Sequence, residues 1–212
     1  MTMLHDRQAD LVIHKPRQPM APGAGLVLLF HGVGSRAEDL RPLGEALAAQ
    51  RAQDWVVSVR SPSPGDVGAG WQWFSVLGVT EQNRPARVAA AMPAFQAAVL
   101  CWQREAGADP AHTTLVGFSQ GAIMALEATQ VTGAALAGRV ISLAGRFAQE
   151  PRRRPLETNI HLMPVALAVN ADRHLRALGA RTTLDRFPGL AHAIDARVVD
   201  AIARRLGETQ AL

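Results

Sequence analysis

A serine flanked by two glycines stands in the middle of the segment 113–125, TTLVGFSQGAIMA. An apolar run leads into GFSQG at 117–121, and a pattern of small residues typical of a helix follows it. This is G-x-S-x-G between a predicted strand and a predicted helix, the setting in which the motif exposes its serine on a sharp turn. The glycines leave room for the close approach of backbone, and the following helix directs its N–H groups toward a developing oxyanion. Ser119 is therefore predicted to be a nucleophile; the alternative is a strand–turn–helix junction that contains a serine by chance.

A serine hydroxyl needs a neighbouring base to react at neutral pH, and imidazole is suited to that task. Of the seven histidines, His192 follows the last predicted strand and precedes the closing helix. The order of nucleophile first and histidine last fits the α/β-hydrolase arrangement. We predict that His192 is the general base, the alternative being a loop histidine without a role.

The sequence HGVG at 31–34 follows a buried apolar run, LVLLF. It is not a phosphate loop, because Ala37 stands where G-x-G-x-x-G has its third glycine and no Walker lysine follows. It is predicted to form half of an oxyanion hole, with backbone N–H groups of Val33 and Gln120 binding the oxyanion. His31 is expected to be a structural hydrogen-bonding residue. No HExxH motif or Cys/His cluster indicates a metal site.

The elements that must position these residues alternate between strand and helix. Strands are predicted at 10–14, 26–30, 55–59, before Ser119, and at 139–143, 160–163 and 181–187. Helices are predicted at 35–49, 84–105, 120–132, 165–178 and 195–206. The spacing of Ser35 and Glu38 suggests a capping box. The alternation predicts an α/β fold with a mostly parallel sheet of about seven strands and helices on both faces. Because chemistry collects at the carboxyl ends of such strands, Ser119, the 31–34 turn and His192 are expected at one edge.

Length and composition favour a globular protein. The 212 residues suit one domain, 1–212, and 48% are hydrophobic while 19% are charged. No segment reaches the roughly 20 apolar residues of a membrane span, and the N-terminus does not have the pattern of a signal peptide. The single cysteine, Cys101, excludes an intrachain disulfide. These observations predict a cytoplasmic protein without stable membrane insertion.

The formal net charge of +4 raises the possibility of a nucleic-acid partner. However, the basic residues are spread through the chain, and the short arginine cluster at 152–154 has no interleaved aromatic residues. A solvated loop is the simpler interpretation of that cluster, so no nucleic-acid partner is expected.

Four segments, LLFHGVGS, WQWFS, GFSQGAIMALE and GLAHAID, together resemble the carboxylesterase/phospholipase group of α/β-hydrolases, relatives of the acyl-protein thioesterases. The likeness runs from Leu26 to the closing helix. It implies Ser119 as nucleophile, His192 as base and the N–H groups of Val33 and Gln120 as oxyanion donors. It also places Trp73 and Phe74 near the acyl pocket, although both fit equally well as core aromatics. Members of the group cleave carboxylic esters, sometimes thioesters or lysophospholipids, without a cofactor.

One feature of the family pattern is missing. The family carries its catalytic acid in an H-G-x-x-D-x-V-type loop after the strand that matches 160–163, but here Pro164 and the next helix follow Met163 directly. Strand-to-helix connections usually take about 2–6 residues, so we expect residues to be absent at this point relative to an active enzyme. Glu150, after the preceding strand, is the best placed of the possible substitutes, although its position is poor. Asp172 lies within a predicted helix, Asp185 lies within a predicted strand, and Asp195 is too close to His192 in the sequence.

Taken together, the residues predict a serine carboxylic-ester hydrolase that forms an acyl-Ser119 intermediate. Because no insertion is long enough for a lid domain, a small-molecule ester or thioester with a short to medium acyl chain is the expected substrate. Two alternatives stay open. The first is a non-catalytic binding protein on the same fold, and the second is an acyltransferase that uses the same acyl-enzyme.

Overall fold

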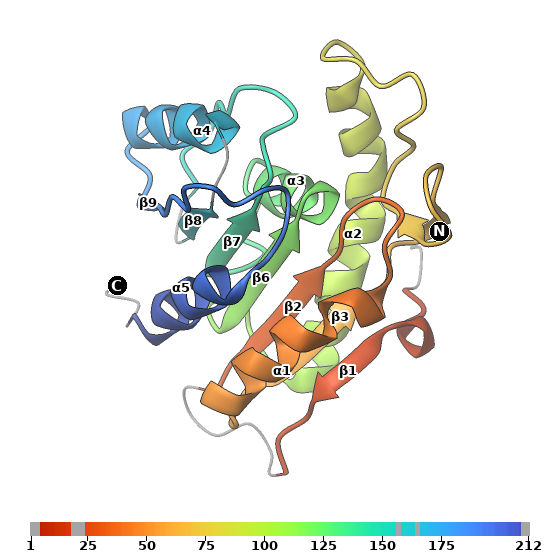
Figure 1. The fold of residues 1–212 in the computed structure, drawn as a ribbon, viewed down its shortest axis with the longest axis vertical. Coiled ribbons are helices and arrows are strands. Elements are labelled where there is room, and N and C mark those ends of the chain that lie inside the picture. The colour runs from red at the N-terminus through yellow and green to blue at the C-terminus, as the bar shows by residue number, and fades with distance from the viewer. Residues whose placement is uncertain (1–4, 18–23, 156–157, 164–165, 209–212) are drawn as a thin grey trace.

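The computed structural model describes residues 5–17, 24–155, 158–163 and 166–208. Seven strands form one sheet in the order β1-β3-β2-β6-β7-β8-β9 (Figure 1). Only the edge pair β1 and β3 is antiparallel; the other five pairs in this sheet are parallel, so the prediction of a mostly parallel sheet is confirmed. The strands are β1 (Leu11–His14), β2 (Leu26–Phe30), β3 (Trp55–Val59), β6 (Thr113–Phe118), β7 (Arg139–Leu143), β8 (Asn159–Met163) and β9 (Thr182–Leu184).

Helices cover both faces of the sheet. The helices α1 and α5 pack on one face, and α2, α3 and α4 pack on the other (Figure 1). Every residue of β2, β3 and β7 is buried. β2 is a continuous apolar run, as expected of a strand covered on both faces, whereas Ser58 of β3 and Arg139 and Ser142 of β7 are buried polar residues. The helices are α1 (Arg41–Gln50), α2 (Arg84–Ala106), α3 (Gln120–Ala128), α4 (Ala166–Ala177) and α5 (Ala196–Gly207).

The register of the parallel strands brings their carboxyl ends to one edge. Phe30 at the end of β2 lies opposite Gly117 in β6, and Leu143 at the end of β7 lies opposite both Phe118 and Met163. The 31–34 turn and Ser119 therefore leave the sheet side by side, as the topological argument requires.

Several element boundaries differ from the sequence expectation, and the helix expected at 120–132 already ends at Ala128. β9 spans only three of the seven residues expected at 181–187, because it is an edge strand that pairs only with β8. The capping box is formed one residue further along than expected, with Arg36 as N-cap and Asp39 as the returning carboxylate, and the first turn is a 3-10 helix, Ala37–Leu40. Glu38 is therefore not the capping residue.

The long connection 61–83 carries a two-stranded hairpin, β4 (Ser63–Pro64) and β5 (Trp71–Gln72). Its backbone is tied to the turn after β2, since the Gly34 N–H donates to the Trp71 carbonyl and the Trp71 N–H donates to the Ser35 carbonyl (2.9 and 2.8 Å). The hairpin thus fixes the position of the turn that was predicted to carry an oxyanion donor.

Candidate active site

Ser119 sits between β6 and α3 in a backbone conformation that a side-chain-bearing residue rarely adopts, with φ 53° and ψ −112°. Such conformations cost of order 1–3 kcal/mol and occur where the surrounding structure enforces them. Here the Ser119 N–H donates to the Leu143 carbonyl (2.9 Å), and the Ser119 carbonyl accepts from the Ile123 N–H (3.1 Å). The strand–sharp turn–helix geometry predicted around G-x-S-x-G is confirmed.

The two glycines of the motif are required by close packing. A Cβ at Gly117 would lie 2.5 Å from the Cα and N of Ala122, and a Cβ at Gly121 would lie 2.6 Å from the Phe30 carbonyl carbon. Real Cβ atoms do not approach other atoms so closely, so both positions accept only glycine. The start of α3 is consequently pressed against the end of β2, next to the 31–34 turn.

The turn after β2 lies close to the predicted nucleophile, Ser119. A Cβ built on Gly32 would lie 3.2 Å from the Ser119 Cβ. Within the described residues, neither the Val33 N–H nor the Gln120 N–H has a hydrogen-bond acceptor. Gln120 is the first residue of α3, where backbone donors have no partner within the helix. Both predicted donors therefore come from segments that meet at Ser119 and have a free N–H group.

The side chain of His31 stabilises this turn through hydrogen bonds. Its side chain is 1% exposed, and its Nε2 accepts from the Ser61 N–H (3.2 Å). Nδ1 therefore carries the proton and donates to the Gly32 carbonyl (2.7 Å). Burial lowers the pKa of His31, an effect that the hydrogen bond to Gly32 opposes only in part. A neutral imidazole with a hydrogen bond at each ring nitrogen agrees with the structural role expected for His31.

The side chain of Gln120 has a role that the sequence reasoning missed. It is 3% exposed; its Oε1 accepts from the Trp73 N–H (2.7 Å) and its Nε2 donates to the Phe74 carbonyl (2.8 Å). Gln120 thereby ties the segment after β5 to the start of α3. The only sequence signal was an amide side chain next to the nucleophile, which can bond an extended backbone with both its atoms.

Trp73 and Phe74 are buried in the hydrophobic core between the sheet and α2. The ring of Trp73 packs edge-on against Phe95 at 5.1 Å between centroids. The structure brings both residues close to the nucleophile helix through Gln120, and it also gives them the packing of core aromatics. Their contact with an acyl group stays a prediction.

His192 lies in the exposed loop between β9 and α5. Its ring packs against the ring of Phe118, with 4.9 Å between centroids and 39° between planes. Phe118 immediately precedes Ser119, so the structure brings His192 to the neighbour of the predicted nucleophile. Within the described residues, the His192 side chain makes no hydrogen bond or ion pair with another side chain. This is true of the Ser119 hydroxyl and of every described carboxylate.

The four carboxylates considered as substitutes for the catalytic acid all have other partners. Asp195 caps α5 by accepting from the Val198 N–H (3.2 Å), and Asp185 receives two hydrogen bonds from Arg205 (2.9 and 3.0 Å). The remaining pairs are Glu150 with His174, Asp172 with Arg176, and Asp195 with Arg197. The junction of Met163 and Pro164 lies outside the described residues. Of all the Asp and Glu residues only Glu157 also lies outside them, and it stands two residues before β8.

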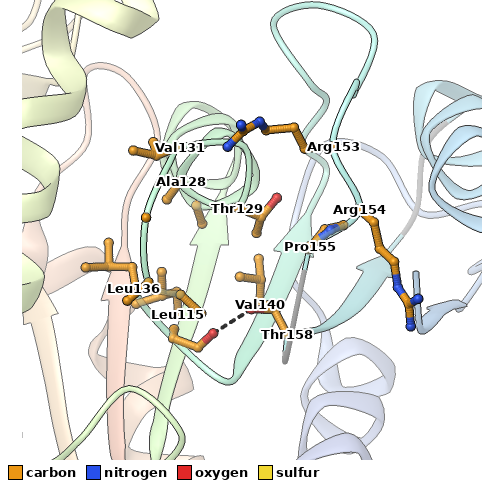
Figure 2. Close-up of a pocket in the computed structure, with 15 residues that line it drawn as sticks. Leu115, Ala128, Thr129, Val131, Leu136, Val140, Arg153, Arg154, Pro155 and Thr158 are labelled. Atoms are coloured by element: carbon orange, nitrogen blue, oxygen red, sulfur yellow. Dashed lines mark hydrogen bonds between the residues drawn. The ribbon is translucent and has the colours of Figure 1, made fainter. Parts of the chain in front are cut away.

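The hollow in Figure 2 lies away from this edge of the sheet. Its volume is about 430 Å³, and it is lined by residues from the C-terminal end of α3 and the amino ends of β7 and β8, including Ala128, Val140 and Thr158. Arg153 extends across its mouth. None of the predicted site residues lines it, so this hollow is not the predicted acyl pocket.

Across residues 5–17, 24–155, 158–163 and 166–208, no group of three or more His, Cys, Asp or Glu side chains is arranged to hold a metal ion. The helices in these ranges include none with the length and apolar character needed to cross a membrane.

Comparison with known proteins agrees with this geometry. The family model for phospholipase/carboxylesterase matches residues 9–209. Esterase YpfH of Escherichia coli K12 is 43% identical over 189 residues, which cover 85% of this chain and 81% of that protein. Among solved structures, esterase PE8 has a TM-score of 0.76 at 26% identity over 92% of this chain and 97% of its own. A carboxylesterase from Mesorhizobium loti has the same fold, with a TM-score of 0.74 at 19% identity over 87% of this chain and 89% of its own. This chain therefore belongs to the phospholipase/carboxylesterase family of α/β-hydrolases and is a carboxylesterase-type hydrolase.

Proposed function

We propose that the chain hydrolyses carboxylic esters through an acyl-Ser119 intermediate, with His192 as general base and the N–H groups of Val33 and Gln120 as oxyanion donors. The observation that carries this proposal is the strained turn at Ser119, which lies at the carboxyl edge of the sheet against Gly32. Strained backbone persists only where the surrounding structure enforces it, and such residues cluster at functional sites.

The reaction follows from the groups at this edge. His192 takes the proton of the Ser119 hydroxyl as the oxygen attacks the acyl carbon, and the oxyanion of the tetrahedral intermediate accepts from the two free backbone N–H groups. The imidazolium then protonates the departing alcohol, leaving the acyl group on Ser119. Water, deprotonated by His192, releases the acid and regenerates the serine. One oxyanion donor of this type is worth about 3–4 kcal/mol in the transition state.

Esters and thioesters with short to medium acyl chains are the proposed substrates. The longest connections around the site are 61–83 and 144–159, and the first of these is already folded back as the β4–β5 hairpin onto the turn after β2. In their described residues, neither connection forms a lid domain that could enclose a long acyl chain. A hydrolysis rate that rises steadily up to palmitoyl esters would contradict this assignment.

His192 has no carboxylate partner among the described residues, and this favours slow turnover over full activity. In a serine protease with a Ser-His-Asp triad, replacing the aspartate lowers kcat by roughly 10⁴-fold. We therefore expect slow turnover, and complete absence of reactivity would instead favour a binding protein on this fold. Acyl transfer would use the same acyl-enzyme, so hydrolysis and transfer are separated by measuring ester formation when an alcohol acceptor is added.

The test is labelling with a fluorophosphonate together with hydrolysis of p-nitrophenyl butyrate. Wild type should be labelled and active, while Ser119→Ala should lose both properties. His192→Ala should lose activity to a similar extent, because the two residues act as a unit. Ser63→Ala, at an exposed serine of the nearby hairpin, is the matched control and should behave as wild type. Equal labelling of wild type and Ser119→Ala would remove Ser119 from the mechanism.

A further inference from the structure

We propose that Phe118 is the positioning residue for His192, holding the imidazole through ring contact in the place where related enzymes use a carboxylate. This inference rests on the proposed function, because it assigns a partner to the base of that mechanism. Its observations are distinct from those that support Ser119.

The first observation is the contact itself. The rings of Phe118 and His192 lie 4.9 Å apart, and this is the interaction that the described structure gives the histidine side chain. Phe118 is the last residue of β6, so its backbone is held in the sheet and by the strained turn that follows. The predicted oxyanion turn at 31–34 also lies close to this ring, since a Cβ on Gly32 would lie 3.5 Å from the Phe118 Cδ1. The ring of Phe118 thus contacts the predicted base and lies near the predicted oxyanion turn.

The second observation is the anchoring of the loop that carries His192. Phe187, Leu190 and Ile194 pack with Phe118 against the same hydrophobic cluster on the α1–α5 face. At the end of the loop, Asp195 caps α5. The backbone around His192 is therefore held by apolar contacts and a helix cap, while the orientation of the imidazole depends on Phe118.

The chemistry of an aromatic face suits both tasks of the missing acid. A carboxylate orients the imidazole and stabilises the imidazolium that forms during the reaction. Packing against a ring restricts the orientation of the imidazole. The face of the same ring also attracts a cation, so it favours the imidazolium over a solvent-only environment. The attraction is weaker than that of a buried carboxylate, which agrees with slow turnover.

The test compares removal of this ring with removal of another buried ring elsewhere in the core. Phe118→Leu should lower kcat for p-nitrophenyl butyrate by about 10- to 100-fold, the range expected when a catalytic group is misplaced by about 1 Å. KM should stay within about twofold, since substrate binding is not the lost interaction. Phe118→Tyr keeps the ring and should retain most of the activity. Phe147→Leu makes the same side-chain change at a buried ring of the core cluster on the other face of the sheet, without ring contact to His192, and should be close to wild type.

A double-mutant cycle separates positioning from simple packing. In the His192→Ala background, adding Phe118→Leu should cause no further loss of the residual rate, because the residue it positions is already gone. An equal loss in both backgrounds, or an equal effect of Phe147→Leu, would overturn the proposal.

The cycle also distinguishes this proposal from the proposed function. If Ser119→Ala and His192→Ala retain full activity, the mechanism itself fails. If both are inactive and Phe118→Leu matches wild type, only the positioning role fails. Should Phe118→Leu not fold, Phe118→Met removes the ring while filling similar space, and the same fold-changes apply.

Discussion

His161 should make the stability of this protein depend on pH. The side chain lies in β8 and is 5% exposed, with Nδ1 hydrogen-bonded to the Thr183 hydroxyl (2.6 Å). In the described structure its Nε2 is buried without a partner. Burial lowers the pKa of His161 to about 4, and the positive charges of Arg139 and Arg205 act in the same direction. The imidazole is therefore neutral in the folded protein at neutral pH.

In the unfolded chain this histidine regains its ordinary pKa of 6.5. Below pH 6.5 the unfolded state binds a proton that the folded state does not, so the free energy of unfolding falls as the pH falls toward 4. A difference of about 2.5 pH units, at about 1.36 kcal/mol for each unit, corresponds to about 3 kcal/mol in total. About 2 kcal/mol of this should already be lost between pH 7.5 and pH 5.

The assay is urea denaturation at pH 7.5 and pH 5, with wild type beside His161→Asn, whose amide does not titrate and can still reach the Thr183 hydroxyl. His31, whose pKa burial lowers, and Glu127, whose pKa burial raises, titrate in both proteins. Their contributions cancel when the pH-dependent change is compared between the two proteins. The change should be about 2 kcal/mol larger in wild type. The same pH dependence in both proteins would refute the reasoning.

Three further predictions concern positions around the site. Gly121→Ala should lower the free energy of unfolding by about 3 kcal/mol and remove esterase activity, because its Cβ would overlap the Phe30 carbonyl; wild-type stability in urea would contradict this. Gln120→Leu leaves two buried backbone groups without partners and should cost about 2–4 kcal/mol together with a loss of kcat. An unchanged melting temperature would show that water replaces the amide. Asp195→Ala removes the cap of α5 and should cost about 1 kcal/mol, which calorimetry would detect as a decrease in Tm of about 2–4 °C.

Much of the architecture could be predicted because its determinants are local in sequence. The fully apolar run of β2 is buried on both faces, as such runs indicate in parallel sheets, and the largely apolar β3 and β7 are buried as well. The motif around Ser119 predicts its own turn, because the two glycines are the residues that permit the backbone approach observed there. Strand alternation was sufficient to place the 31–34 turn beside Ser119, since parallel strands share one carboxyl edge.

Side-chain partnerships could not be predicted in the same way. The Phe118–His192 contact joins residues more than seventy positions apart, and both aromatic and imidazole rings are compatible with many neighbours. The side chain of Gln120 bonds the backbone at 73 and 74 only because β5 is folded back onto the turn after β2.

The partners of the acidic residues were likewise decided by the tertiary structure. Asp185 and Asp195 follow β9 within the same connection as His192, and sequence distance alone does not show which cation each would meet. The fold places Asp185 against Arg205 of α5 and Asp195 at the start of that helix, so both carboxylates are engaged away from the imidazole. The sequence by itself predicted the sheet and the sharp turn at Ser119, because backbone patterning is read from neighbouring residues, while the pairing of Ser119 with His192 stays a prediction. Which group contacts the histidine was decided only by packing between segments that are distant along the chain.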